Sequence, residues 1–286
     1  MTTSDTLPPL REVIARHGLA ARKSLGQHFL LDRNLTDRIA RAAGDLSTGT
    51  TIEIGPGPGG LTRSLLRHGA TRVVALERDP RAVAAIRELA VGFRERLAVV
   101  EADALVVDVA SLGPTPRRIV ANLPYNISTV LLTRWLHVIA RQGPTSLESM
   151  TLMFQKEVVD RLVAQPRTKD YGRLSVLTQV VCQVARLFDI TPTAFVPPPK
   201  VVSTVVRLVP RATLPAAADG APLDLKTLEA VTAAAFGQRR KMLRTSLRAV
   251  FPKPGTVLEG CGISETLRAE ELEPSTFVAL ATFKPL

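Results

Sequence analysis

The feature that most constrains the fold is a regular alternation of short apolar segments with longer amphipathic ones between residues 51 and 154. The apolar segments are typical of buried strands, and we expect strands at 51–54, 73–76, 97–100, 118–121 and 150–154. Helices are predicted before and between them, at 10–17, 34–43, 61–68, 81–90 and 128–141. Strands separated by helices pair in parallel through right-handed crossovers. The sequence therefore predicts an α/β fold with a doubly wound sheet.

Polar or flexible residues lie just past four of these strands. They are Gly55, Glu77, Asp103 and Asn122. Ligands of open α/β sheets bind beyond the carboxyl ends of the strands, so we expect these four residues to share one site.

The C-terminal part of the chain has a different character. A proline-rich segment at 210–222 is interpreted as a linker. Helices are expected beyond it at 225–236 and 239–250, followed by short helical pieces at 264–268 and 274–280. We therefore predict a large domain over residues 1–210 and a small helical domain over residues 215–286.

Composition excludes several classes of protein. No apolar run approaches the ~18 residues of a membrane helix, and the N-terminus lacks the apolar core of a secretory signal. The two cysteines are far apart, and the four histidines do not have metal-ligand spacing. We expect a cytoplasmic, monomeric protein without a metal or a membrane partner. The net charge of +11 favours a polyanionic partner, with nucleic acid the first candidate.

The glycine-rich loop after the first predicted strand matches a dinucleotide pattern through Gly55, Gly57 and Gly60, and the acidic Glu77 follows at a suitable distance. A pyrophosphate, however, needs free backbone N–H groups. Pro56 and Pro58 remove two of these donors, and the nearby Glu53 adds negative charge. The loop is better suited to S-adenosylmethionine, which carries a sulfonium and an ammonium but no phosphate.

Two carboxylates then have expected roles toward that cofactor. Glu77 would accept hydrogen bonds from both ribose hydroxyls, and Asp103 would hold the adenine amino group. The alternative is that both residues merely cap strand ends.

The tetrapeptide from Asn122 to Tyr125 indicates the reaction. The lone pair of a purine amino group is conjugated into the ring, so the nitrogen is a poor nucleophile. The Asn122 side-chain carbonyl and the Leu123 backbone carbonyl could accept its two N–H bonds and favour a reactive geometry. Pro124 would stiffen the turn, and Tyr125 would offer a face on which the base stacks. An ordinary proline turn with a buried tyrosine is the alternative.

The chain resembles the ribosomal RNA adenine N6-methyltransferases, most closely the branch that dimethylates small-subunit rRNA. The matching segments are GQHFL (26–30), EIGPGPGGLT (53–62), ERD (77–79), EADAL (101–105), NLPYNIS (122–128), FQKEV (154–158), YGRLSV (171–176), FVPPPKVVSTVV (195–206) and FGQRRKMLRTSL (236–247). The resemblance implies dimethylation of two adjacent adenosines in a hairpin near the 3′ end of 16S rRNA, within an assembling small subunit.

The same resemblance implies the site residues. The S-adenosylmethionine contacts would be His28, Leu30, Gly55, Gly57, Glu77, Asp103 and Asn122. The first of these positions is often asparagine in the family, and a histidine there keeps a hydrogen-bonding role. Phe195 would stack on the target base opposite Tyr125.

A basic segment supplies the expected RNA contacts. They are Arg239, Arg240, Lys241, Arg244 and Arg248. On a continuous helix Arg240, Arg244 and Arg248 would share one face, and a face without acidic residues favours contact with a phosphate backbone. Arg22 and Lys23 would add positive charge near the cofactor entrance. For Arg173, contact with phosphate and a helix-capping role both stay open.

Three alternatives remain at this stage. One is the related macrolide-resistance type of enzyme, which modifies one adenosine of large-subunit rRNA. Another is an rRNA-binding assembly factor, or a nucleic-acid-binding relative, for which methylation is dispensable. The third is a nicotinamide-dependent oxidoreductase, which the two loop prolines disfavour.

Overall fold

The computed structural model describes residues 7–21, 26–216 and 223–283. Its backbone contacts divide the chain into two compact units. Unit 1 comprises Met1–Trp135, Thr145–Lys156 and Ala185–Val209, and unit 2 comprises Leu136–Pro144, Glu157–Val184 and Pro210–Leu286. The last segment of unit 2 begins at Pro210, near the predicted boundary between the domains. Unit 2 also includes Leu136–Pro144 and Glu157–Val184, which were predicted to belong to the large domain.

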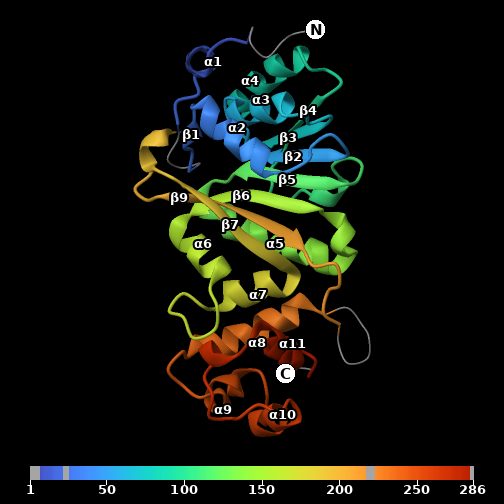
Figure 1. Cartoon of the computed structure of the whole chain (residues 1–286), viewed down its shortest axis with the longest axis vertical. Helices are drawn as coiled ribbons and strands as arrows, with labels where there is room; N and C mark the ends of the chain where they lie inside the picture. The colour runs from blue at the N-terminus through green and yellow to red at the C-terminus, as the bar shows by residue number, and fades with distance from the viewer. Residues whose placement is uncertain (1–6, 22–25, 217–222, 284–286) are drawn as a thin grey trace. The chain divides into compact units, whose positions relative to one another are not determined.

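Helices and strands alternate along the first half of the chain, as Figure 1 shows. The helices are α1 (Leu10–Arg16), α2 (Arg33–Ala42), α3 (Gly60–Arg67), α4 (Pro80–Val91), α5 (Tyr125–Gln142), α6 (Lys156–Val163), α7 (Arg173–Val181), α8 (Leu225–Gly237), α9 (Leu243–Ser246), α10 (Pro254–Gly260) and α11 (Pro274–Ala281). The strands are β1 (Phe29–Leu30), β2 (Thr50–Ile54), β3 (Val73–Glu77), β4 (Leu97–Glu101), β5 (Arg117–Asn122), β6 (Ser149–Gln155), β7 (Cys182–Ile190), β8 (Phe195–Val196) and β9 (Ser203–Pro210).

The main sheet has seven strands in the order β4-β3-β2-β5-β6-β9-β7. Strands β2 to β6 pair in parallel, whereas β9 runs antiparallel to β6. After β2 the chain builds β3 and β4 on one side, then returns to build β5 and β6 on the other. The predicted doubly wound α/β fold is confirmed, and its topological switch point lies between β2 and β5.

All five predicted strands are present, but β7 and β9 were not predicted. Both extend the sheet beyond β6. Most residues of β7 are exposed or half-buried, as is typical of an edge strand, so this segment carries little of the apolar signal that marked the central strands.

Burial explains why the central strands were recognisable. Every residue of β2 and β3 is buried; β3 is apolar up to Glu77, whereas β2 also buries Thr50, Thr51 and Glu53 beside its isoleucines. Helices α3 and α4 pack on β3, and α4 also packs on β4 (Figure 1). Helix α4 begins at Pro80, where the Asp79 carboxylate accepts a hydrogen bond from the Arg81 amide at 3.1 Å. These contacts fix the strand ends and the turns that follow them.

Unit 2 has a core of its own. Helices α7, α8 and α11 pack against one another. The Phe236 ring lies 5.8 Å from Tyr171 and 5.4 Å from Phe277, measured between ring centroids. The fully buried Tyr171 also donates a hydrogen bond from its hydroxyl to the Leu272 carbonyl at 2.8 Å. One aromatic residue therefore joins the segment before α7 to the chain before α11.

The predicted helix over residues 239–250 is wrong. Helix α8 ends at Gly237, residues 238–240 form a turn, and only the four residues of α9 and a 3-10 helix at Leu247–Ala249 follow. The Leu243 amide donates to the Leu267 carbonyl at 2.8 Å, so this backbone pairs with another loop instead of continuing the helix. Arg240, Arg244 and Arg248 therefore do not share one helical face.

Two features are absent from the part of the chain that the structure describes. No helix there is long and apolar enough to cross a bilayer. No three histidine, cysteine, aspartate or glutamate side chains there are grouped in a way that could hold a metal ion. Part of the predicted linker, residues 217–222, lies outside the described residues.

The hydrogen bond of Tyr171 generates a stability prediction. Tyr171→Phe keeps the ring between its aromatic neighbours but leaves the Leu272 carbonyl without its partner. We expect the free energy of unfolding to fall by about 1–3 kcal/mol, the cost of an unsatisfied buried polar group. Urea unfolding followed by circular dichroism measures this, and an unchanged midpoint would show that the hydrogen bond contributes nothing net.

Candidate functional site

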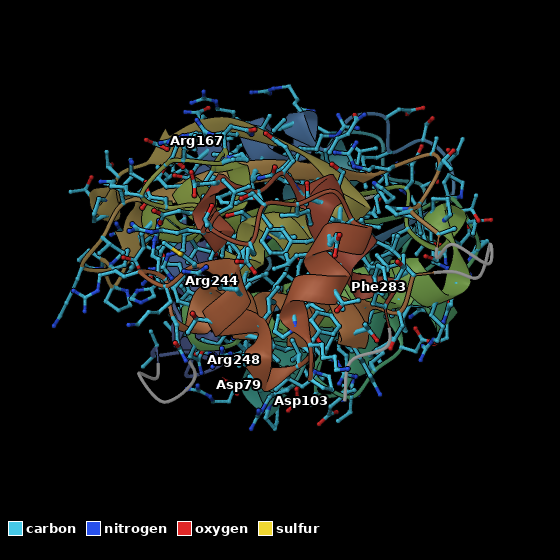
Figure 2. All side chains as sticks on the ribbon, turned by 90° about the horizontal axis from the view of Figure 1, so that it is seen from below. Asp79, Asp103, Arg167, Arg244, Arg248 and Phe283 are labelled. Atoms are coloured by element: carbon cyan, nitrogen blue, oxygen red, sulfur yellow. The ribbon has the colours of Figure 1, made fainter. Side chains whose placement is uncertain are left out.

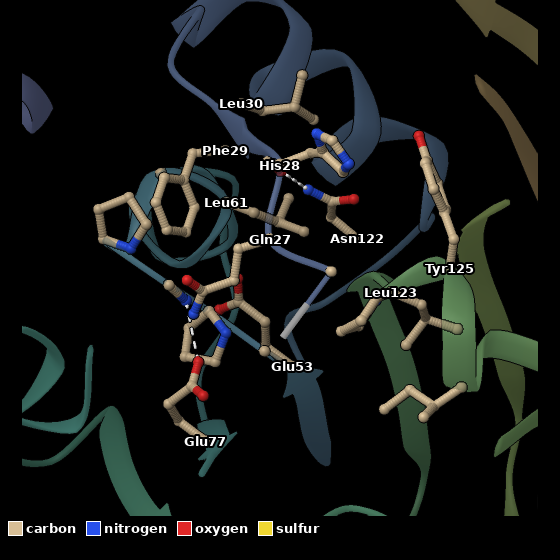
Figure 3. A pocket seen from close by; sticks show the side chains of 18 of the residues that line it. Gln27, His28, Phe29, Leu30, Glu53, Leu61, Glu77, Asn122, Leu123 and Tyr125 are labelled. Carbon is tan, nitrogen blue, oxygen red and sulfur yellow. Dashed lines mark hydrogen bonds between the residues drawn. The ribbon is translucent and has the colours of Figure 1, made fainter. Parts of the chain in front are cut away.

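A cavity in unit 1 lies at the switch point of the sheet. Its walls come from the segment around β1, the turn after β2, the end of β3 and the turn after β5 (Figure 3). Its lining includes His28, Leu30, Glu53, Gly55, Gly57, Glu77, Asn122, Leu123, Pro124 and Tyr125. The structure thus brings together most of the predicted site residues, although they come from distant parts of the sequence.

The glycine-rich turn offers no free amide to a phosphate over residues 55–59. The Gly55 amide donates to the Leu76 carbonyl at 2.9 Å, and the Gly59 amide donates to the Pro56 carbonyl at 3.0 Å. The Gly57 amide donates to the Glu77 carboxylate at 3.3 Å. The two prolines have no N–H at all. A pyrophosphate-binding loop requires such amides to point at the ligand, so this turn has the wrong chemistry for a dinucleotide.

Glu77 organises the turn from the neighbouring strand. Besides Gly57, the amides of Arg78 and Asp79 donate to its carboxylate at 2.8 and 2.9 Å. Burial raises the pKa of Glu77, and these three amides oppose the rise because they favour the ionised form. The carboxylate is thereby fixed at the cavity wall, with acceptor capacity left for a ligand hydroxyl.

The backbone conformation at position 57 and the nearby Phe29 ring both favour glycine there. Its φ of +55° lies in the left-handed region, and a Cβ there would stand 3.0 Å from the Phe29 ring. Any other residue would strain the turn and push against that ring.

Asn122 ends β5 with a defined orientation. Its side-chain nitrogen donates to the His28 backbone carbonyl at 2.9 Å (Figure 3). Because the nitrogen is held there, the side-chain oxygen is directed away from His28 as an acceptor. Asn122 therefore has the polarity that was expected for accepting an N–H bond from an amine.

Tyr125 is the first residue of α5, and its ring lies against His28. The two ring centroids are 5.5 Å apart and the planes are inclined by 29°. The Tyr125 hydroxyl is hydrogen-bonded to the Ser203 hydroxyl at 2.6 Å, and a His28 ring nitrogen lies 2.8 Å from the Pro197 carbonyl oxygen. Sequence analysis missed Ser203 because it follows 78 positions later, in a strand that was not predicted.

Phe195 does not occupy the place that was predicted for it. It is 2% exposed and belongs to the hydrophobic core of unit 1. The cause is a two-stranded sheet in which β8 pairs antiparallel with β1, so that Phe195 lies opposite Leu30. The ring is therefore a core residue, and in this structure His28 is the aromatic neighbour of Tyr125.

Asp103 lies beside the cavity wall and does not line the cavity itself. Its carboxylate accepts from the Arg78 guanidinium at 2.9 Å and from the Leu105 amide at 2.9 Å. Arg78 does line the cavity, so Asp103 is placed next to the site through this ion pair.

Glu53 is the site residue that sequence analysis described least correctly. It was expected to be a negative charge beside the loop, but its side chain is 1% exposed. Burial raises the pKa of Glu53 to about 8, so the carboxyl is mostly protonated at neutral pH.

The basic segment of unit 2 contains two kinds of side chain. Arg239 and Arg244 form ion pairs with Glu270 at 2.6 Å and with Glu265 at 3.0 Å. Arg240, Lys241 and Arg248 are exposed and make no side-chain hydrogen bond or ion pair with the described residues. Arg244 lies in α9 and Arg248 in the 3-10 helix that follows it (Figure 2). Arg22 and Lys23 lie outside the described residues.

A doubly wound sheet with an acidic residue at the end of β3 and an Asn-Leu-Pro-Tyr segment that leads from the end of β5 into α5 is typical of one class, the Rossmann-like methyltransferases. Comparison with known proteins places the chain within that class. The chain belongs to the ribosomal RNA adenine dimethylase family, whose model matches residues 18–284.

Individual relatives cover nearly the whole chain. A protein of Paramagnetospirillum magneticum named ribosomal RNA small subunit methyltransferase A is 61% identical over 96% of this chain and 94% of its own length. A protein of the same name from Rhodospirillum rubrum is 58% identical over 98% of this chain and 93% of its own.

Solved structures show the same fold. A dimethyladenosine transferase from Plasmodium falciparum has a TM-score of 0.73 and 25% identity over 88% of this chain and 96% of its own. The 23S rRNA methyltransferase ErmE has a TM-score of 0.61 and 28% identity over 88% of this chain and 98% of its own.

The three amides bound by Glu77 generate a prediction about the turn. Glu77→Ala leaves the amides of Gly57, Arg78 and Asp79 without an acceptor. We expect the free energy of unfolding to fall by about 1–3 kcal/mol and these amides to exchange faster with deuterium. Hydrogen exchange resolved by NMR measures the second effect.

The matched control is Glu101→Ala, at the end of β4. This carboxylate is exposed and pairs with Arg87 at 3.0 Å. An exposed ion pair contributes about 0–1 kcal/mol. If both variants behaved alike, the structural role given to Glu77 would be wrong.

Proposed function

We propose that this protein transfers methyl groups from S-adenosylmethionine to the N6 atoms of two adjacent adenosines in the 3′-terminal hairpin of 16S rRNA, during assembly of the small ribosomal subunit. Family membership and the near-complete match to relatives named small subunit methyltransferase A support the reaction and the substrate. The observation that carries the proposal is the orientation of Asn122, whose nitrogen is held by the His28 carbonyl.

The cavity residues fit S-adenosylmethionine. The turn over 55–59 has no amide to spare for phosphate, as this phosphate-free ligand allows. Glu53 presents a buried Oε2 atom that has no hydrogen-bond partner among the described residues, which suits a positively charged ligand. Glu77 would hold the ribose hydroxyls, with Leu30 and Gly55 forming the walls. Asp103 does not line the cavity, so its carboxylate would contact the adenine amino group from its position next to Arg78.

When bound, S-adenosylmethionine supplies an electrophilic methyl group on a sulfonium. The protein's part is to present the adenine amine. Asn122 Oδ1 and the Leu123 carbonyl would accept its two N–H bonds, which localises the nitrogen lone pair toward the methyl carbon. Methyl transfer would form the C–N bond as the donor's C–S bond breaks, and the amine would then release its proton to water. Positioning therefore provides most of the catalysis.

Tyr125 and Pro124 would define the place of the base. The hydrogen bond to Ser203 holds the Tyr125 ring at the cavity edge, and ring stacking fits any purine face. Phe195 is 2% exposed and does not line the cavity, so we assign the stacking face to Tyr125 in this proposal.

The alternative substrate is large-subunit rRNA, as the name of the 23S methyltransferase ErmE suggests. The higher identity of the small-subunit enzymes over nearly the full chain favours 16S rRNA. Methylation assays with 30S particles and with 23S rRNA fragments separate the two. Incorporation into 23S fragments alone would contradict the proposed substrate. Thermal-shift titration with NAD tests the oxidoreductase alternative, for which no stabilisation is expected.

The proposed role of Asn122 predicts a separation of activity from binding. Asn122→Ala should abolish methyl transfer and leave RNA affinity largely intact, because the side chain acts on the amine and not on the RNA backbone. Radiolabelled methyl incorporation and a filter-binding titration measure the two quantities. Asn34→Ala, at an exposed position of α2, is the control. Comparable turnover in Asn122→Ala would refute the assigned role.

The basic segment predicts a difference between its paired and unpaired members. Replacing Arg240 and Lys241 by alanine should weaken RNA binding and reduce the slope of log K against log salt by about one per lost phosphate contact. Arg244→Ala should have a smaller effect, because its guanidinium is already paired with Glu265. Equal salt slopes for all variants and the wild type would show that this segment does not contact the RNA backbone.

A further inference from the structure

Glu53 is a buried carboxyl with an incomplete set of partners. It lies in β2, and its register neighbours are Ala75 of β3 and Val120 of β5, both apolar and buried. Glu53 lines the cavity at the switch point of the sheet, which we propose as the S-adenosylmethionine site. Its Oε2 atom has no hydrogen-bond partner among the described residues. A buried carboxyl oxygen in this state is unfavourable as an anion unless a ligand supplies the missing interaction.

The groups around Glu53 leave its protonation state sensitive to the charge of a ligand. Burial raises its pKa to about 8, the nearby Glu77 carboxylate adds to the rise, and Thr62 of α3 opposes it. The other titratable groups that line the cavity already have partners. Arg78 pairs with Asp103, His28 lies against the Pro197 carbonyl, and Tyr125 bonds to Ser203.

We propose that the Glu53 carboxyl distinguishes the methyl donor from the spent cofactor by charge. It loses its proton to solvent when the sulfonium-bearing donor binds, and it regains one when the neutral thioether product occupies the same cavity. This inference rests on the proposed function, because it takes the cavity as the S-adenosylmethionine site.

The physical reason is the change of one unit of charge that methyl transfer causes inside the cavity. Before transfer, the sulfonium compensates an ionised Glu53. After transfer, the ionised carboxyl would be buried beside Glu77 without the sulfonium charge that had compensated it, which is unfavourable. Taking up a proton from water removes that charge. The ammonium group is common to donor and product, so it does not contribute to the difference.

The ionisation of Glu53 makes the relative affinity for donor and product depend on pH. In the free protein Glu53 ionises as the pH rises through its pKa of about 8. Above that pH the donor binds without displacing a proton, whereas the product binds next to an uncompensated anion. The preference for donor over product should therefore increase with rising pH.

Calorimetry of the full chain tests the inference. Titrations at pH 7 with S-adenosylmethionine, S-adenosylhomocysteine and the analogue bearing an ammonium in place of the sulfonium are run in buffers of different ionisation enthalpy, which reports the number of protons released. For the wild type we expect donor and ammonium analogue to release up to about one proton more than the thioether. In Glu53→Gln this difference should vanish. Glu101→Gln, an exposed carboxyl at the end of β4, should retain it.

A measurement on the unaltered chain guards against misfolding of the Glu53 variant. In protein labelled with 13C at the glutamate carboxyls, one resonance should titrate around pH 8. The donor should move that resonance to its ionised position, and the thioether should not. An equal response to both ligands, or a proton difference that persists in Glu53→Gln, would overturn the inference.

The outcomes also separate this inference from the proposed function. If neither the donor nor the thioether gave a binding signal, the cofactor assignment itself would fall and the inference with it. If both bound with the same proton count, only the role given to Glu53 would fall.

Discussion

The site depends on one carboxylate that holds three backbone amides. Glu77 binds the N–H groups of Gly57, Arg78 and Asp79, and so connects the turn after β2 to the end of β3. This interaction consumes a donor that a phosphate-binding loop would direct at its ligand. The glycine spacing matches that of dinucleotide-binding loops, but in this turn the amides of Gly55, Gly57 and Gly59 all donate within the protein. Charge and hydrogen bonding, rather than the glycine pattern, decide the chemistry of the turn.

Parallel pairing brings the remaining parts of the site together. Strands β2 and β5 are parallel neighbours at the switch point, and the turn after β2 and Asn122 line the same cavity. The small sheet of β1 and β8 adds His28 and Leu30 from a segment far away in the sequence. The cavity is thus assembled from strand ends that the sheet holds rigidly, as positional catalysis requires.

The sequence predicted the central strands, because their buried cores contain short apolar runs, and it predicted that residues at several strand ends would share one cavity, which Gly55, Glu77 and Asn122 line. It did not predict β7, whose exposed edge position weakens the apolar signal. The supposed helix over 239–250 is broken because its backbone pairs with the loop around Leu267, a contact that helical periodicity does not reveal. Phe195 is buried by the pairing of β8 with β1. Pairings of this kind depend on distant segments, so no local pattern encodes them.

The anchor of Asn122 has a consequence for variation within the family. Its nitrogen is held by the main-chain carbonyl of His28, which every amino acid possesses. A change of side chain at position 28 would therefore leave the hydrogen bond that orients Asn122 in place. The side chain itself is available for other contacts, and in this chain the His28 ring lies against Tyr125 and the Pro197 carbonyl.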